Sequence, residues 1–230
     1  MSEPTRPARS APRAGSTTRR VEGVLRRLVL LGAPVAMLLA VLVHPETGHH
    51  DPAAAFLPVA DRYLVVHLLL VPAGALLAAG LYSLVARARG PLALVARLET
   101  AVFGFLITVY ASIAGLAVGI LATEAPSGVE RATLAPLVDS LFATPIPVLL
   151  AILTILSYLV ATVATAAVLR RAGAPLVPLL ALVGSTVAIY NHLGLTGLVG
   201  TGLYLVAVTW LEFGWSRDSG RVSSERPTGS

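Results

Sequence analysis

The sequence predicts an all-α fold, a polytopic membrane bundle of six transmembrane helices with both termini in the cytoplasm. Three observations predict it: an apolar composition, six long apolar runs, and the distribution of arginine. The 230 residues are 56% hydrophobic and only 13% charged, whereas soluble domains are about a quarter charged. The chain is therefore too apolar for an ordinary soluble domain.

Six apolar stretches are long enough to cross a bilayer core about 30 Å thick, which needs about 20 helical residues. They are Leu28–Val43, Tyr63–Ala86, Leu98–Ala122, Ile146–Leu169, Pro175–Tyr190 and Leu195–Phe213. The first and fifth stretches are short, so we expect their ends to shift by up to a turn. No small-residue cleavage site follows the first stretch, which is therefore interpreted as a span and not as a signal peptide.

Arginine placement gives the orientation. Fifteen of the 17 basic residues, all of them arginine, lie in the two tails, the second-to-third connection and the fourth-to-fifth connection. Only Arg62 and Arg131 fall in the other loops. Because arginine-rich segments stay in the cytoplasm, the chain should cross the cell (cytoplasmic) membrane an even number of times. The lysine-free, Ala/Leu/Val/Arg-rich composition is typical of a high-GC bacterial genome.

The two tails have a different composition from the spans. Residues 1–22 and 216–230 are rich in Ser, Thr, Pro and Arg and nearly free of large apolar side chains. Such segments bury too little apolar surface to offset the entropy of ordering. We therefore expect a disordered basic N-terminal tail (1–22), a six-helix transmembrane domain (23–215) and a disordered C-terminal tail (216–230).

The third loop should contain a short helix that lies in the membrane interface. Ser127 and Glu130 have the spacing of a capping box, and apolar residues then recur at helical intervals, with charged residues on the rest of the turn. The apolar positions are Val129, Leu134, Leu137, Val138 and Leu141. We expect this helix to end before Thr144, because Pro145 and Pro147 suit the start of the next helix and not an interior.

Several classes of function are excluded by composition. The chain has no cysteine, which rules out disulfides, thiolate metal sites, iron–sulfur clusters and cysteine nucleophiles. It has no lysine either, so Schiff-base chemistry and a P-loop lysine are absent. The net charge of +5 sits in tails and loops beside apolar spans, so it indicates membrane topology and not nucleic-acid binding.

All five histidines map to the predicted outer side. His44 ends the first span, His49 and His50 follow in the loop, His67 lies one to two turns inside the second span, and His192 lies between spans five and six. Imidazole is a common metal ligand and an axial ligand of haem. We therefore take His44, His67 and His192 as candidate ligands of a divalent metal or haem. No HExxH spacing supports this, and a histidine near an interface often bonds only a backbone carbonyl or a headgroup.

Two carboxylates near these histidines, Glu46 and Asp61, would orient the rings of such a site. Glu99 lies in the third span, near its inner face. A proton or cation relay would place a carboxylate there. We favour a simpler interpretation, in which Glu99 pairs at the interface with Arg97, Arg87 or Arg89.

Small residues recur at four-residue spacing in two spans. Ala111, Gly115 and Gly119 form one such series, and Gly197 with Thr201 and Thr196 with Gly200 form others. Small residues let helix backbones approach closely in a membrane. We expect Gly115 and Gly119 to face another helix, either in this chain or in a membrane-protein partner or second copy.

Three short motifs carry a family resemblance. They are Leu42-Val43-His44-Pro45, His67-Leu68-Leu69-Leu70 and Gly80-Leu81-Tyr82. In these segments, which span roughly the first half, the chain resembles a group of uncharacterised bacterial membrane proteins, mostly actinobacterial. The group has no assigned activity, so the resemblance implies only a polytopic membrane protein and draws attention to His44 and His67.

Three functional classes remain after these exclusions. The absence of catalytic motifs and the small-residue faces favour a non-enzymatic accessory or structural membrane component that contacts the lipid bilayer and partner proteins. The histidines favour a metal- or haem-binding membrane protein instead. A small-solute transporter ranks last, because transporters usually show repeats, broken spans and midplane charge, and this chain lacks midplane charge.

Overall fold

The computed structural model describes residues 15–45, 57–125, 128–186 and 194–215, and every regular element among them is helical. The elements are α1 (Gly15–Val43), the 3₁₀ turn η1 (Leu57–Val59), α3 (Ala60–Val85), α4 (Pro91–Ala111), the π-helix η2 (Ser112–Ala117), α5 (Val118–Glu124), α6 (Gly128–Ala143), α7 (Pro145–Arg171), α8 (Leu176–Gly184), α10 (Gly194–Thr209) and the π-helix η3 (Trp210–Trp215). The predicted all-α class is confirmed for these residues.

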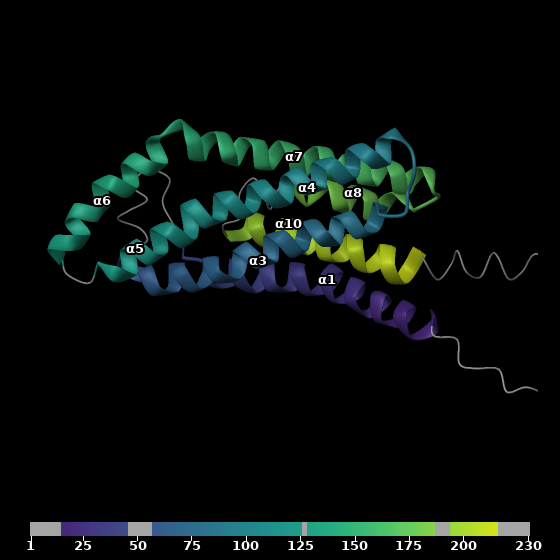
Figure 1. Cartoon of the computed structure of the whole chain (residues 1–230), viewed down its shortest axis with the longest axis horizontal. Coiled ribbons are helices and arrows are strands. Elements are labelled where there is room, and N and C mark those ends of the chain that lie inside the picture. The colour runs from purple at the N-terminus through teal and green to yellow at the C-terminus, as the bar shows by residue number, and fades with distance from the viewer. Residues whose placement is uncertain (1–14, 46–56, 126–127, 187–193, 216–230) are drawn as a thin grey trace, which may run out of the picture.

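The long helices run side by side along one axis of the molecule (Figure 1). Helix α3 packs between α1 and α4, α4 packs on α7, and α10 lies between α1 and α8. Helix α6 closes one end of the bundle, and α1 begins and η3 ends at the opposite end. These two ends are called the α6 end and the tail end below.

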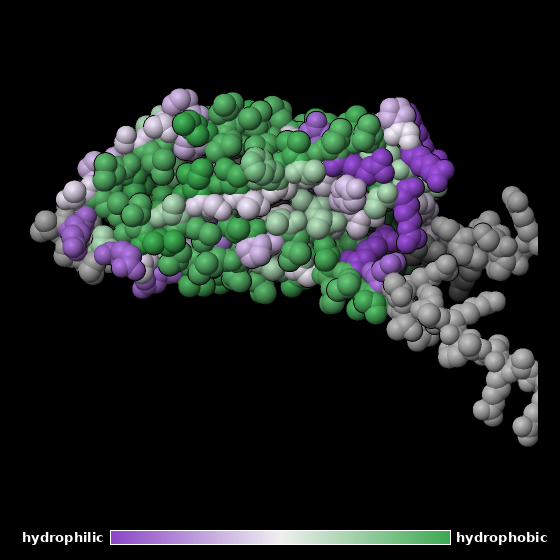
Figure 2. Space-filling view, in the orientation of Figure 1, coloured by the Kyte–Doolittle hydropathy of each residue, from purple (hydrophilic) through white to green (hydrophobic). Residues whose placement is uncertain are grey.

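Five helical segments among the described residues are long and apolar enough to cross a membrane. They are Val21–Val43, Leu57–Val85, Pro91–Glu124, Pro145–Arg171 and Gly194–Trp215. On the face drawn in Figure 2, a broad hydrophobic band separates hydrophilic residues at the two ends. Such a band matches the cross-section of a bilayer, so the chain has the architecture of an integral membrane protein.

The structure differs from the predicted spans and tails in two places. Helix α8 has nine residues, or about 14 Å at 1.5 Å per residue, too short to cross a membrane alone. The last four residues of the predicted fifth span, 187–190, lie outside the described residues. In addition, α1 begins at Gly15, so part of the tail predicted to be disordered is helical, because extending an existing helix needs no new nucleus.

The predicted helix of the third loop is present as α6. It ends at Ala143, and α7 starts at Pro145 with Thr144 as its N-cap residue, as the prolines suggested. Val138 is buried against residues of α3 and α5, so α6 covers that end of the bundle. Ser127 lies outside the described residues, and so does the predicted capping box.

Tyrosine side chains connect helices inside the bundle. The hydroxyl of Tyr158 in α7 lies 2.8 Å from that of Ser185, directly after α8, and Tyr204 in α10 donates to the Leu77 carbonyl of α3 at 3.2 Å. Phe103 of α4 contacts the Tyr158 ring, with centroids 4.5 Å apart. Each buried hydroxyl is thus satisfied across a helix interface, while its ring fills the core.

The small-residue faces pack inside this chain. An ideal Cβ on Gly115 would lie 1.9 Å from Cδ2 of His67, and one on Gly119 would lie 3.1 Å from Cα of Leu64. Both glycines therefore face α3, which confirms the prediction that they face another helix. In α10, Gly197 and Thr201 are buried as well.

Candidate functional site

Two of the three predicted ligands meet at the α6 end. His44 directly follows α1, and His67 lies in the second turn of α3. Their rings are in edge-to-face contact, with centroids 5.2 Å apart and an interplanar angle of 72°. Tyr63, one turn before His67, places its ring centroid 4.2 Å from that of His67 and 5.9 Å from that of His44. We call His44, Tyr63 and His67 the histidine cluster.

The backbone fixes the tautomer of both imidazoles. Nδ1 of His44 lies 2.7 Å from the carbonyl oxygen of Pro45, and Nδ1 of His67 lies 2.8 Å from that of Tyr63. A carbonyl oxygen can only accept, so each Nδ1 carries the proton and donates it. Each neutral ring then has its lone pair on Nε2, which is how histidines are commonly oriented when they bind a metal.

The cluster rests on the π-helical turn η2. Tyr63 donates its hydroxyl proton to the carbonyl of Ala114 at 2.7 Å, and the ring of His67 lies against Gly115. A π-helical turn inserts one extra residue and shifts the helical hydrogen bonds, and such turns are frequent at functional sites. The glycine is required because any side chain there would occupy the space of the imidazole.

His44 is held where α1 meets α3. Arg62 donates from Nε to the carbonyl of Val43, and so satisfies one of the last carbonyls of α1. Both histidines are buried, at 7% and 5% exposure. Burial lowers the pKa of His44, the bond to Pro45 opposes this, and the charge of Arg62 lowers the pKa further. His44 is therefore neutral at pH 7.

The histidine cluster supplies two nitrogen ligands. His192, His49 and His50 lie outside the described residues. Within the described ranges, no group of three or more His, Cys, Asp or Glu side chains is placed to hold a metal ion. Two rings in direct edge contact leave no room for a porphyrin between them, so this pair does not fit bis-histidine haem ligation.

The preferred interpretation of Glu99 is wrong. Among the described residues, Glu99 forms no ion pair within 4.0 Å, whereas Glu212 does. Arg97 donates instead to the carbonyls of Ala86 and Ala88, at 3.3 and 3.2 Å. For Arg97 the physical reason is helix geometry, because residues two positions apart on a helix point in different directions and do not face each other.

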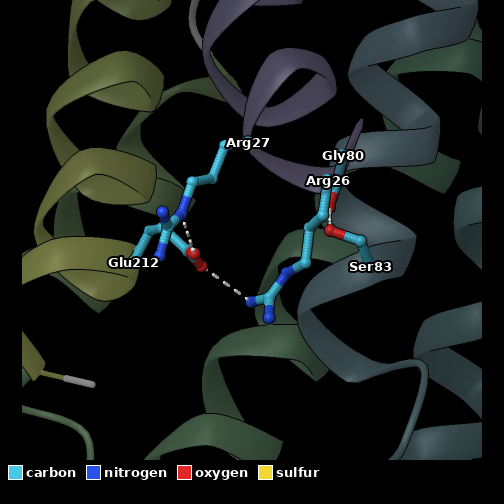
Figure 3. A network of polar contacts seen from close by, with 5 residues as sticks. All are labelled: Arg26, Arg27, Gly80, Ser83 and Glu212. Carbon is cyan, nitrogen blue, oxygen red and sulfur yellow. Dashed lines mark hydrogen bonds and ion pairs between the residues drawn. The ribbon is translucent and has the colours of Figure 1, made fainter. Parts of the chain in front are cut away.

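Sequence reasoning missed a second polar group, at the tail end. Glu212 of η3 is only 9% exposed and lies between two arginines of α1 (Figure 3). Its Oε2 is 3.0 Å from Nη2 of Arg26, and its Oε1 is 3.2 Å from Nε of Arg27. The guanidinium of Arg27 also lies 5.4 Å from the ring centroid of Phe213. We call Arg26, Arg27 and Glu212 the arginine cluster.

One signal for this cluster was present in the sequence. Glu212 is an acidic residue inside the predicted sixth span, and Arg26 and Arg27 directly precede the first. A carboxylate in a span calls for a partner, but the sequence does not show that the first and last spans are neighbours. Neither a protein-family model, nor a curated protein, nor a solved structure matches this chain. Function must therefore be argued from these two clusters and the bundle around them.

Proposed function

We propose that the chain is a non-enzymatic structural or accessory component of a bacterial cytoplasmic membrane. The observation that carries the proposal is the use of polar side chains inside the bundle. Tyr63, Tyr158 and Tyr204 each connect two helical segments, and buried threonines such as Thr100 and Thr201 bond the carbonyl one turn earlier. The tyrosine hydroxyls therefore hold helical segments together, while the threonine hydroxyls are satisfied within their own helices.

The proposed topology has six spans with both termini inside and α6 in the outer interface. Its support is the charge of the tail end, which comes from the start of α1, the connection after α3, the second turn of α4 and the end of α7. These segments carry Arg26, Arg27, Arg87, Arg89, Arg97, Arg170 and Arg171. Positive charge of this kind marks the cytoplasmic side. Helix α8 with the residues after it would supply the fifth of the six spans in chain order.

Single-cysteine labelling tests the topology, because the chain has no native cysteine to give a background. Membrane-impermeant maleimide applied to intact cells should label His50→Cys and Glu130→Cys. Arg89→Cys, Ala172→Cys and Glu225→Cys should react only after the cells are opened. Labelling of any of these three in intact cells would reject the six-span arrangement.

Photocrosslinking tests the accessory role. Leu149, Ile152, Leu156 and Val163 of α7 are exposed and share one face of the helix. A photoreactive residue at these positions should give one discrete adduct in native membranes, with a partner protein or a second copy. Phe103 is fully buried, and the same residue there should give none. Lipid adducts alone at all four positions would contradict the role.

A second candidate function is metal binding by the histidine cluster. The specific observation in its favour is that His44 and His67, 23 positions apart, are in ring contact with both Nδ1 protons donated to carbonyls. Elemental analysis and an absorption spectrum of the purified protein should then show stoichiometric zinc or copper, lost in His44→Asn and His67→Asn. The His192→Asn variant tests the third predicted ligand. Protein that stays metal-free at micromolar zinc and copper rejects the site.

A further inference from the structure

A shallow hollow lies on α1 next to the arginine cluster. Its volume is about 200 Å³, and it is lined by Val24, Arg27, Leu28, Leu31 and Gly32. A Cβ added to Gly32 would meet nothing within 4 Å, so the missing side chain leaves open space there. Val24 and Leu28 are themselves exposed. The hollow is thus an apolar depression on the surface that faces the surrounding membrane.

The arginines beside the hollow carry more positive charge than their partner neutralises. Two guanidinium groups share the single carboxylate of Glu212, and the side chains of Arg26 and Arg27 are 45% and 56% exposed. The bond from Arg27 to Glu212 uses Nε, which leaves its two terminal nitrogens as donors. Glu22, one turn before Arg26, is exposed and pairs with neither arginine within the described residues.

The order of these residues along α1 matches the depth profile of a phospholipid. Arg27 lies near the start of the span Val21–Val43, where headgroups are found. Leu28, Leu31 and Gly32 follow it toward the membrane interior, over about 7.5 Å of helix. A guanidinium at the interface with an apolar depression below it offers a phosphate site and an acyl-chain site in one line.

We propose that Arg27 and this hollow bind one phospholipid with an anionic headgroup. The terminal nitrogens of Arg27 donate to the phosphate, and the first part of an acyl chain lies over Gly32 between Leu28 and Leu31. Glu212 holds Arg27 by Nε and so presents its terminal nitrogens to the lipid. The anionic headgroup supplies the negative charge that the arginine cluster lacks.

Native mass spectrometry of the full chain in nanodiscs tests this site. Discs are made of phosphatidylcholine with and without phosphatidylglycerol, and the number of retained lipids is counted. The intact protein should retain one phosphatidylglycerol in preference to phosphatidylcholine. Arg27→Gln should lower that preference about fivefold, since an interfacial arginine contributes about one kcal/mol of attraction to anionic lipid. Arg89→Gln, an equally charged change at the same end, should leave it unchanged.

Substitutions at Gly32 that fill the hollow distinguish a defined lipid site from nonspecific attraction of anionic lipid to a charged surface. Gly32→Leu should reduce retention of phosphatidylglycerol by a similar factor, and Gly32→Ala, which is smaller and helix-favouring, should reduce it less. Inorganic phosphate at millimolar concentration should not compete. Equal losses in Arg27→Gln and Arg89→Gln, unchanged retention in both Gly32 variants, or full competition by phosphate would each overturn the proposal. Nanodiscs expose both faces, so the result does not depend on the proposed topology or partner.

Discussion

The two polar clusters of this bundle are built on the same plan with opposite chemistry. Each joins α1 to another helix, and each uses a π-helical turn, η2 under the histidine cluster and η3 within the arginine cluster. The histidine cluster consists of uncharged rings bonded to backbone carbonyls, and the ring of His67 packs on Gly115. The arginine cluster consists of charges, two of them half-exposed.

Burial explains the difference. Charged groups withdrawn from water carry a large desolvation cost, which side chains at the membrane boundary avoid by keeping their polar ends in water. Arg26 and Arg27 lie close enough to the end of their span to do this, whereas His67 lies deeper in the bundle and is satisfied as a neutral ring. The histidine cluster should therefore depend on packing and the arginine cluster on charge.

The largest expected effect is on the packing of the histidine cluster. Gly115→Ala places a Cβ 1.9 Å from the ring of His67, so the ring or α3 must move. Overpacking of this kind typically costs about 1–3 kcal/mol, and thermal unfolding in detergent should show it. Gly202→Ala is the control, because its Cβ meets nothing within 4 Å. Equal melting temperatures for both variants would contradict the packing argument.

The next effect concerns charge in the arginine cluster. Glu212→Gln leaves two guanidinium groups without their carboxylate, and we expect a loss of about 1–2 kcal/mol, between the values for exposed and buried pairs. Added salt should reduce the difference between variant and parent. Glu99→Gln removes the same charge from a residue that forms no ion pair with the described part of the chain, and it should change stability little. A larger loss of stability in Glu99→Gln than in Glu212→Gln would contradict the role given to the arginine cluster.

A single hydrogen bond tests how η2 holds the histidine cluster. Tyr63→Phe keeps the ring but removes the donor to the Ala114 carbonyl, which should cost about 1 kcal/mol. Tyr82 is exposed on the same helix, so Tyr82→Phe is the matched control. If both variants have the melting temperature of the parent, the carbonyl of Ala114 has another donor and the π-helical turn does not need Tyr63.

The smallest effect is the pH dependence from His44. Because burial lowers its pKa below 6.5, the folded state binds fewer protons than the unfolded state as the pH falls past 6.5. Stability should therefore be complete above that pH and decrease below it, by at most about 0.8 kcal/mol between pH 7.5 and 6. On acidification, the melting temperature of His44→Asn should therefore decrease less than that of the parent. A parent whose stability rises on acidification would contradict the sign.

Helix positions were predictable because each depends on a local run of residues. The apolar stretches located α1, α3, α4 with α5, α7 and α10, and the prolines at 145 and 147 located the boundary after α6. The glycine spacing predicted that Gly115 and Gly119 face another helix. The ends of the helices were less predictable. Helix α1 extends to Gly15 by continuing an existing helix, and no run of apolar residues marks this extension.

The sequence by itself therefore determined the class of molecule: apolar helices long enough for a membrane, interrupted by prolines and separated by arginine-rich connections. Only the tertiary structure decided which polar residues meet. His44 with His67, and Glu212 with Arg26 and Arg27, are pairings between helices, and sequence spacing carries no information about which helices are neighbours. Helix order depends instead on how side-chain shapes fit, as where the ring of His67 lies against the bare backbone of Gly115.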